Sequence, residues 1–277
     1  MDIQHIHIDI SSHAPHIMPQ VTNEPYYFVI LFEGSASFSI NFTRYTSRGK
    51  TLVFLTPYQL LEWHESEASI IGVLRFHGDF YCIEYHKEEV SCNGILFNNI
   101  YAKPFVSISA HIFKEITDIF HKIENFGRPV HDYDLSILKS YLQLILALSS
   151  REKQVEPDHI SLKSGAQVGL SDFPLLLEEH FLTSKSVSFF AKHYNLSVDA
   201  FSKKIKALFH KPPSQLIRER LVLEAKKLLH LTYKSIKEIA DELGFEDEFY
   251  FSRYFKKEVG VSPKTFRRTV GISIVAK

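Results

Sequence analysis

The sequence predicts an α+β protein of two domains: an N-terminal β domain followed by two helices, and a C-terminal domain made only of helices. Its length of 277 residues exceeds that of most single domains. Hydrophobic residues make up 45% of the chain, which is sufficient for packed cores. The period of the apolar pattern changes along the chain from two residues to about 3.6. We therefore expect one domain over residues 1–150, a linker over 151–169 and a second domain over 170–277.

Short apolar segments that are broken by turn signals fill residues 26–97. The segment "YYFVILFEG" is rich in aromatic and β-branched residues, and "SASFSINF" places every second residue from Ala36 to Phe42 on one face. The run "TLVFLTP" ends at a proline, and "SIIGVLRF" follows a polar turn. Many short strands at close spacing are typical of an all-β barrel or sandwich.

The apolar spacing becomes helical after Pro104. Ile112, Ile116 and Ile119 share one side of a first predicted helix. The segment "DLSILKSYLQLILALSS" predicts a second helix with a broad apolar stripe from Leu135 to Leu146. Two such helices can cap a barrel or pair with a second copy of the chain, and the sequence leaves both alternatives open.

Short helices fill the chain beyond the polar segment "SREKQVEPDHISLKSGAQVG", which has the composition of a linker. The apolar spacing predicts helices over residues 173–182, 187–193, 198–209, 213–230, 236–243 and 247–259, with a last turn from Pro263.

The two halves of the chain carry opposite charge. Residues 1–150 hold 10 basic and 16 acidic side chains, a net charge of −6, whereas residues 151–277 hold 22 and 16, a net charge of +6. This asymmetry indicates that the C-terminal half meets a polyanion, although uneven surface charge alone would give the same numbers.

One unit occurs twice in the helical half, as "SVSFFAKHYNLSVDAFSKKIKALF" and "SIKEIADELGFEDEFYFSRYFKKEV". Each copy begins with a serine suited to an N-cap and has an alanine in the middle of its first helix. A turn and a second helix with apolar residues four apart follow in both copies. A small alanine lets two helices cross closely, so we expect two helix-turn-helix units, whose second helices lie in the DNA major groove.

The second helices divide into a buried face and a DNA-facing face. We expect Phe245, Phe251 and Phe255 to belong to the core. Arginine can make a bidentate contact to guanine, serine can bond bases or phosphate, and an exposed phenylalanine can pack on a thymine methyl group. The side chains predicted to face bases are Ser202, Lys203, Lys206, Glu248, Phe249, Ser252 and Arg253.

The segment "IKEIADELGFEDEFYFSRYFKKEVGVSPKTFRR" resembles the signature of the AraC/XylS family of transcriptional regulators. The resemblance covers residues 170–268 and implies a DNA-binding domain of two helix-turn-helix units, with "PSQLIRERLVLEAKKLLH" as the joining helix. The first unit departs from the family pattern: His210 stands where a glycine is common, and Asp199 and Ala200 are poor base readers.

The resemblance also implies an N-terminal cupin-like barrel that senses a small molecule and helps the chain to form a homodimer. Activation is the commoner role in the family, so we expect an activator whose partners are double-stranded DNA, RNA polymerase and an effector of unknown identity. Phosphate contacts are expected from six side chains, Ser186, Ser235, Lys256, Lys257, Arg267 and Arg268.

Catalysis and metal binding are not expected. Metal-binding cupin enzymes use a His-x-His pair with partners on neighbouring strands, and the pair here, His5 and His7, lies upstream of the strands. We therefore predict no catalytic residue, cofactor or metal, and structural roles for His64 and His77.

The cellular location is predicted from what the sequence contains. Two cysteines, Cys82 and Cys92, fit buried thiols in a reducing compartment, and the apolar runs are too short for a bilayer. The start of the chain does not resemble a signal peptide, so we expect a cytoplasmic protein. Two rival functions stay open: a ligand-independent regulator with a dimerisation-only barrel, and a cupin enzyme with a helical appendage.

Overall fold

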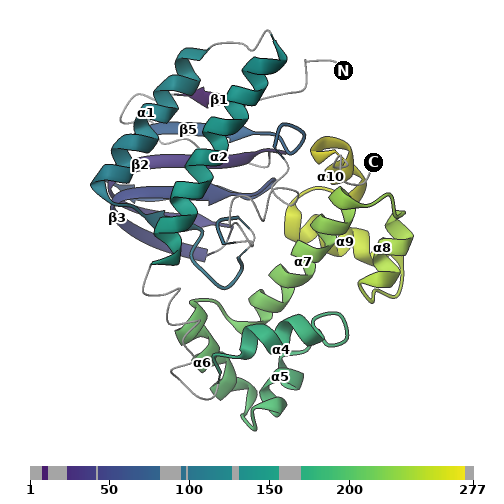
Figure 1. Ribbon diagram of the computed structural model, residues 1–277. Helices are drawn as coiled ribbons and strands as arrows, with labels where there is room; N and C mark the ends of the chain where they lie inside the picture. Colours follow the sequence, from purple (N-terminus) through teal and green to yellow (C-terminus); the bar gives the residue numbers. More distant parts are fainter. Residues whose placement is uncertain are drawn as a thin grey trace.

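The structure is a computed structural model that describes residues 8–11, 24–41, 43–81, 95–97, 99–126, 131–155 and 170–271. A β domain with two long helices across it stands beside a domain of shorter helices (Figure 1). The described strands are β1 (Ile8–Ser11), β2 (Tyr27–Ile40), β3 (Thr43–Leu55), β4 (Leu61–Ser66), β5 (Ser69–Phe76) and β6 (Phe105–Ser107). They form one antiparallel sheet in the order β1, β5, β2, β3, β6, with β4 paired to β2.

Strand β2 is the centre of the sheet. One of its edges pairs with β3 from Phe28 to Ile40, while the other edge pairs first with β5 and then with β4. The change of partner occurs near Gly34, whose φ is 127°. A Cβ atom at this position would stand 2.7 Å from the Cα of Ala68, so only glycine fits where the β4–β5 turn crosses β2.

The sheet curls over its own apolar face. Phe105 on β6 pairs with Val53 near the end of β3, yet its ring lies 6.0 Å from that of Tyr45 near the start of the same strand. It also lies 5.7 Å from the ring of Phe38 on β2. Such contacts require a strong bend, so the sheet has a barrel-like form. The predicted order of a β domain, two helices and a helical domain is confirmed.

Helices α1 (Ala110–Phe126) and α2 (Asp132–Gln154) lie across the opposite face of the sheet (Figure 1). Ile116 of α1 and Leu142 of α2 are fully buried with Leu52 and Leu74 of the sheet. This resolves one alternative from the sequence, because the helices do cover the β domain. Helix α2 extends to Gln154, so the first four residues of the predicted linker are helical.

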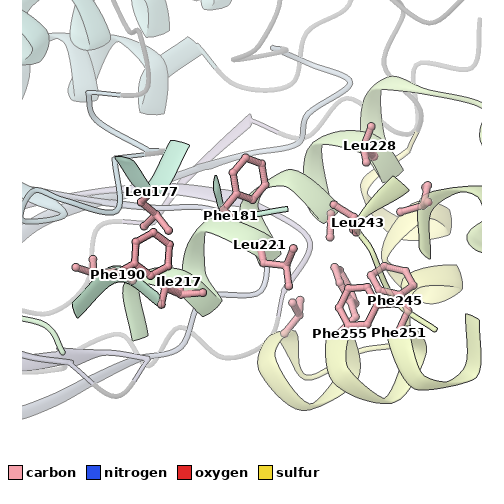
Figure 2. Packing of buried hydrophobic residues seen from close by; sticks show 14 of the residues in the cluster. Leu177, Phe181, Phe190, Ile217, Leu221, Leu228, Leu243, Phe245, Phe251 and Phe255 are labelled. Atoms are coloured by element: carbon pink, nitrogen blue, oxygen red, sulfur yellow. The ribbon is translucent and has the colours of Figure 1, made fainter. Parts of the chain in front are cut away.

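Seven described helices make up the C-terminal domain. They are α4 (Phe173–His180), α5 (Val187–His193), α6 (Val198–Phe209), α7 (Pro213–Leu231), α8 (Ile236–Glu242), α9 (Glu248–Val259) and α10 (Pro263–Val270). One apolar cluster runs through all of them, with Phe190 at one end, Leu221 of α7 in the middle and Phe255 at the other end (Figure 2). The predicted helices are confirmed to within two residues at each end.

Candidate nucleic-acid interface

The first helix-turn-helix unit consists of α5, a tight turn and α6. The hydroxyl of Ser186 caps α5 by accepting a hydrogen bond from the amide of Ser188 at 3.2 Å. The turn is closed by the amide of Leu196, which donates to the carbonyl of Ala191 at 3.0 Å. Ala191 is almost fully buried, so the helices cross over its small side chain, as the sequence predicted.

The second unit repeats this construction with α8 and α9. Ser235 and Glu238 form a capping box, in which the Ser235 amide donates to the Glu238 carboxylate at 2.7 Å. Hydrogen bonds from Ser235 lower the pKa of Glu238. The amide of Phe245 closes the turn on the carbonyl of Ala240 at 2.9 Å, the same five-residue spacing as in the first unit. Asp247 then caps α9 through the amide of Tyr250 at 2.6 Å.

The apolar residues of the second helices are buried as predicted. Phe251 and Phe255 are 1% and 0% exposed, and Phe245 fills the turn with its ring 5.2 Å from that of Phe251. These three rings lie next to one another on the buried side of α9, tilted relative to each other (Figure 2). Phe201 and Ile205 occupy the matching positions of α6 and are equally buried.

Most side chains predicted to face bases are accessible. Lys203, Lys206, Arg253 and Phe249 are exposed, the last of them by 68%. The remaining three, Ser202, Glu248 and Ser252, are half-buried at the edges of the same faces. In the described part of the chain, Arg253 makes no ion pair, so its guanidinium group is available to a ligand. The roles of these seven side chains toward DNA stay predictions.

The six side chains predicted to contact phosphate differ in how accessible they are. Lys256, Lys257 and Arg268 are exposed. Arg267 is half-buried and donates to the carbonyls of Leu229 at 3.2 Å and Lys234 at 2.6 Å, and burial lowers its pKa. It thus ties α10 to the end of α7.

The hydroxyl groups of Ser186 and Ser235 serve as helix caps and are engaged within the protein. The backbone amide of Ser235 already donates to the Glu238 carboxylate, so a phosphate contact there would not use this amide. The roles of both serines toward phosphate stay predictions.

Two side chains that the sequence did not single out share the exposed surface. Tyr250 follows Phe249 at the start of α9 and is 48% exposed, and Lys204 lies beside Lys203 on α6. The signal that could have found Tyr250 is the run of aromatics "EFYFSRYF", because residues at helical spacing from the buried Phe251 and Phe255 face the core and Phe249 and Tyr250 fall outside that spacing.

The two domains are in direct contact. The hydroxyl groups of Tyr58 and Thr269 lie 2.5 Å apart, and Nε2 of His77 lies 2.7 Å from the carbonyl of Thr269. Gln215 of α7 donates to the hydroxyl of Thr43 at 2.7 Å. The β domain therefore holds the ends of α7 and α10, away from the exposed faces of α6 and α9.

A cavity of about 200 Å³ lies between the domains. Tyr45 and Pro57 line it from the β domain, and Val222 and Lys226 line it from α7. The ammonium group of Lys226 donates to the carbonyl of Pro57 at 2.8 Å, and burial lowers its pKa to about 8. Within the described residues, this ammonium group has no carboxylate partner.

The histidines and cysteines considered as ligands are placed as follows. His64 hydrogen-bonds to Ser39 at 2.6 Å, and His77 contacts Thr269, so both have structural contacts. The part of the chain that the structure describes contains no group of three His, Cys, Asp or Glu side chains arranged to hold a metal. The remaining candidates, His5, His7, Cys82 and Cys92, lie outside the described residues. None of the described helices is long and apolar enough to cross a membrane.

Comparison with known proteins identifies relatives of the C-terminal domain. Residues 190–269 match the family described as "Helix-turn-helix domain". The HTH-type transcriptional regulator YfiF of Bacillus subtilis (strain 168) is 30% identical over 149 residues, which are 51% of this chain and 46% of that protein. The chain thus spans about half the length of this relative.

Two further proteins resemble a larger share of the chain. The HTH-type transcriptional activator RhaR of Cronobacter sakazakii (strain ATCC BAA-894) is 26% identical over 207 residues, 73% of this chain and 71% of that protein. The crystal structure of ToxT from Vibrio cholerae O395 covers 97% of this chain and 100% of its own, at 14% identity and a TM-score of 0.43. The matched residues 190–269, the paired units and the signature over residues 236–268 show that the C-terminal domain is a helix-turn-helix domain of the AraC/XylS family.

Proposed function

We propose that this chain is a sequence-specific DNA-binding regulator of transcription, and that it acts as an activator. The observation that carries the proposal is the repeated unit, in which the same turn hydrogen bond sets an exposed, basic second helix on a shared core. The net charge of +6 over residues 151–277 favours a polyanionic partner. RNA polymerase is the second partner that an activator requires, and the cytoplasmic location stays a prediction.

In this proposal, α6 and α9 enter successive segments of the major groove on one side of the duplex. Arg253 is suited to a bidentate contact with guanine, and the ring of Phe249 to a thymine methyl group. Glu248 can accept from the amino group of cytosine. We assign Lys203 and Lys206 of α6, which the sequence predicts to face bases, to phosphates together with Lys256 and Lys257 of α9. Phosphate contacts position the protein but carry no sequence information.

Selection from random duplex DNA with the full chain at two salt concentrations tests the proposal. Two short enriched blocks about one helical turn apart, roughly 10 base pairs, are expected. Salt-sensitive binding without an enriched motif would mean that the protein holds only the DNA backbone. Absence of binding at both salt concentrations would remove the proposed function.

The cavity between the domains supports a role for a small effector. Its wall includes the ammonium group of Lys226, which is buried beside a carbonyl and the ring of Phe266. A buried charge is costly unless it is fully hydrogen-bonded, so a ligand that presents an acceptor group to this ammonium would stabilise it. Because the cavity walls come from both domains, such a ligand would alter how the helices of the C-terminal domain are held.

Thermal unfolding of the full chain across a panel of metabolites tests the effector. A ligand that binds the folded state should raise the melting temperature. The variant Lys226→Met should lose that shift while it keeps the fold. If no metabolite shifts the wild-type melting temperature, the ligand-independent alternative gains support.

A homodimer through the β domain is supported by the outer side of α2. Tyr133, Ile137 and Leu144 are exposed there by 83%, 41% and 41%, and Val155 follows at the end of the helix. Their spacing of four, seven and eleven residues keeps them on one side, as in helices that pair. The double variant Ile137→Lys/Leu144→Lys should shift the molar mass from dimer to monomer in light scattering; an unchanged mass would refute this interface.

An enzymatic role is the weakest reading, because the AraC/XylS family is not an enzyme class. The barrel-like sheet is the feature that the chain shares with cupin enzymes, and a fold alone does not carry a reaction.

A further inference from the structure

The loop that leads into the first helix-turn-helix unit touches the second unit through Lys185. This residue lies in the loop between α4 and α5, immediately before the cap of the first unit. Its ammonium group donates to the carbonyl of Gly244 at 2.7 Å and stands 4.0 Å from the centre of the Phe245 ring. Gly244 and Phe245 are the turn of the second unit, 59 residues further along the chain. Burial lowers the pKa of Lys185, as expected for an ammonium group held against protein.

The backbones meet at the same place. Gly244 has a φ of 66°, in the left-handed region that favours glycine. A Cβ atom on Gly244 would stand 3.2 Å from the carbonyl oxygen of Leu182, which is tighter than ordinary contact. The loop of the first unit is therefore packed directly on the turn of the second.

A second set of contacts ties the end of α4, where this loop begins, to the joining helix. Arg220 of α7 lies 3.9 Å from the ring centre of Phe181 and pairs with Glu178 of α4 at 2.7 Å. It also pairs with Glu224 of α7 itself at 3.0 Å. Figure 2 shows Phe181 and Leu243 on either side of Leu221, so the apolar core continues across this junction.

A single helix that joins two units leaves them free to change their angle by bending or by rotation of the side chains between them. A further contact between the two sides of the domain, at a distance from the axis of α7, restricts this motion, because the second unit is then held at two points. We propose that Lys185 is a positioning residue: its contact with Gly244 and Phe245 sets the distance and angle between α6 and α9. It thereby sets the spacing between the two DNA blocks that the protein reads. This inference rests on the proposed function and names the contact that fixes the relative placement of α6 and α9.

The test uses the selected two-block site and versions with one base pair added or removed between the blocks. Each base pair moves the second block by about 3.4 Å along the duplex. The wild-type full chain should bind the selected spacing tightly and the altered spacings weakly.

The variant Lys185→Met keeps the apolar stem of the side chain but removes the ammonium group, and with it the donor to Gly244, the charge and the contact with the Phe245 ring. We expect its preference for the selected spacing over the altered ones to fall by about fivefold. This is the low end of the range measured for energetic coupling between two sites of a protein. Lys185→Arg keeps a donor and should restore most of the preference. The matched control is Lys237→Met, which removes one exposed charge from α8.

The outcomes separate this inference from the proposed function. If Lys185→Met weakens binding to all three spacings equally, as a lost phosphate contact would, the positioning role is refuted. An unchanged spacing preference refutes it as well, provided that the melting temperature confirms a folded variant. A wild-type protein that selects no two-block motif would remove the proposed function itself, and this inference with it.

Discussion

The two helix-turn-helix units share one backbone design and differ in what they present to a ligand. Both turns are closed by a hydrogen bond back to a buried alanine, and both second helices start at a side-chain cap. The exposed face of α9 carries Phe249 and Arg253, which suit base edges, whereas α6 begins with Asp199 and Ala200 and continues with lysines. The comparison teaches that one packing solution can present two different surfaces. In the proposed function, α9 reads sequence and α6 mainly contacts phosphates.

The units also differ at their turns. In the first unit the helix cap, Ser197, directly follows the residue that closes the turn, whereas in the second unit one further residue separates Phe245 from Asp247. The extra residue is Glu246. Gly244 stands at the same place in its turn as Asn195 in the first unit, and both are left-handed, with φ of 66° and 54°. Only the second turn has a contact with Lys185, through the carbonyl of Gly244. Beyond the turn, the two second helices run in register to their ends.

The largest expected effect concerns the shared core. Phe201→Ala and Phe251→Ala should each lower the free energy of unfolding by about 3–5 kcal/mol, because both rings are fully buried.

The units belong to one apolar cluster, so urea unfolding of the C-terminal domain followed by fluorescence and circular dichroism should give one transition. The exposed Phe249 is the control, and Phe249→Ala should change stability by no more than about 0.5 kcal/mol. Two separate transitions would contradict a common core.

The second effect is on sequence readout. Arg253→Ala should weaken binding to the selected site by about 1–3 kcal/mol and relax the preference at one base pair, because a bidentate contact is lost. Binding isotherms on the selected site and on its single-base variants measure this. Equal affinity of Arg253→Ala and the wild type would remove the base-reading role from α9.

The third effect sharpens the contrast with the first unit. Lys203→Ala on α6 and Lys256→Ala on α9 should each weaken binding evenly across sequences and reduce the salt slope by about one. Titrations at several salt concentrations provide the slope. If Lys203→Ala instead changed the preferred sequence, α6 would read bases and the division of tasks would be wrong.

The smallest effect concerns the residues that end the two second helices. His210 and Gly260 both adopt left-handed conformations, with φ of 59° and 90°. Because a side chain is strained there, Gly260→Ala should destabilise the domain by about 1 kcal/mol. His210→Gly should be stabilising by about 0.5 kcal/mol, since relief of strain exceeds the entropy that glycine adds to the unfolded chain. Melting temperatures check both, and a destabilised His210→Gly would show that the imidazole makes a contact worth more than the strain.

Local patterns in the chain determined most of the secondary structure. The helical period and the capping residues Ser186 and Ser235 located the C-terminal helices, because propensity, caps and apolar spacing agree over short windows. The buried roles of Phe251 and Phe255 followed from their four-residue spacing. A helix face is a local property, so the sequence alone can identify it.

Contacts between distant residues were decided only by the tertiary structure. The sequence pattern around Arg267, Lys226 and Lys185 does not predict their contacts. Arg267 binds backbone carbonyls, Lys226 lines the cavity, and Lys185 donates to the carbonyl of Gly244. The side of the sheet that α1 and α2 cover was likewise open in the sequence. These features depend on how whole elements pack, and packing is set by the summed shape of many side chains rather than by any one segment. The sequence by itself determined two helix-turn-helix units and a β domain, and the fold decided how they are held together.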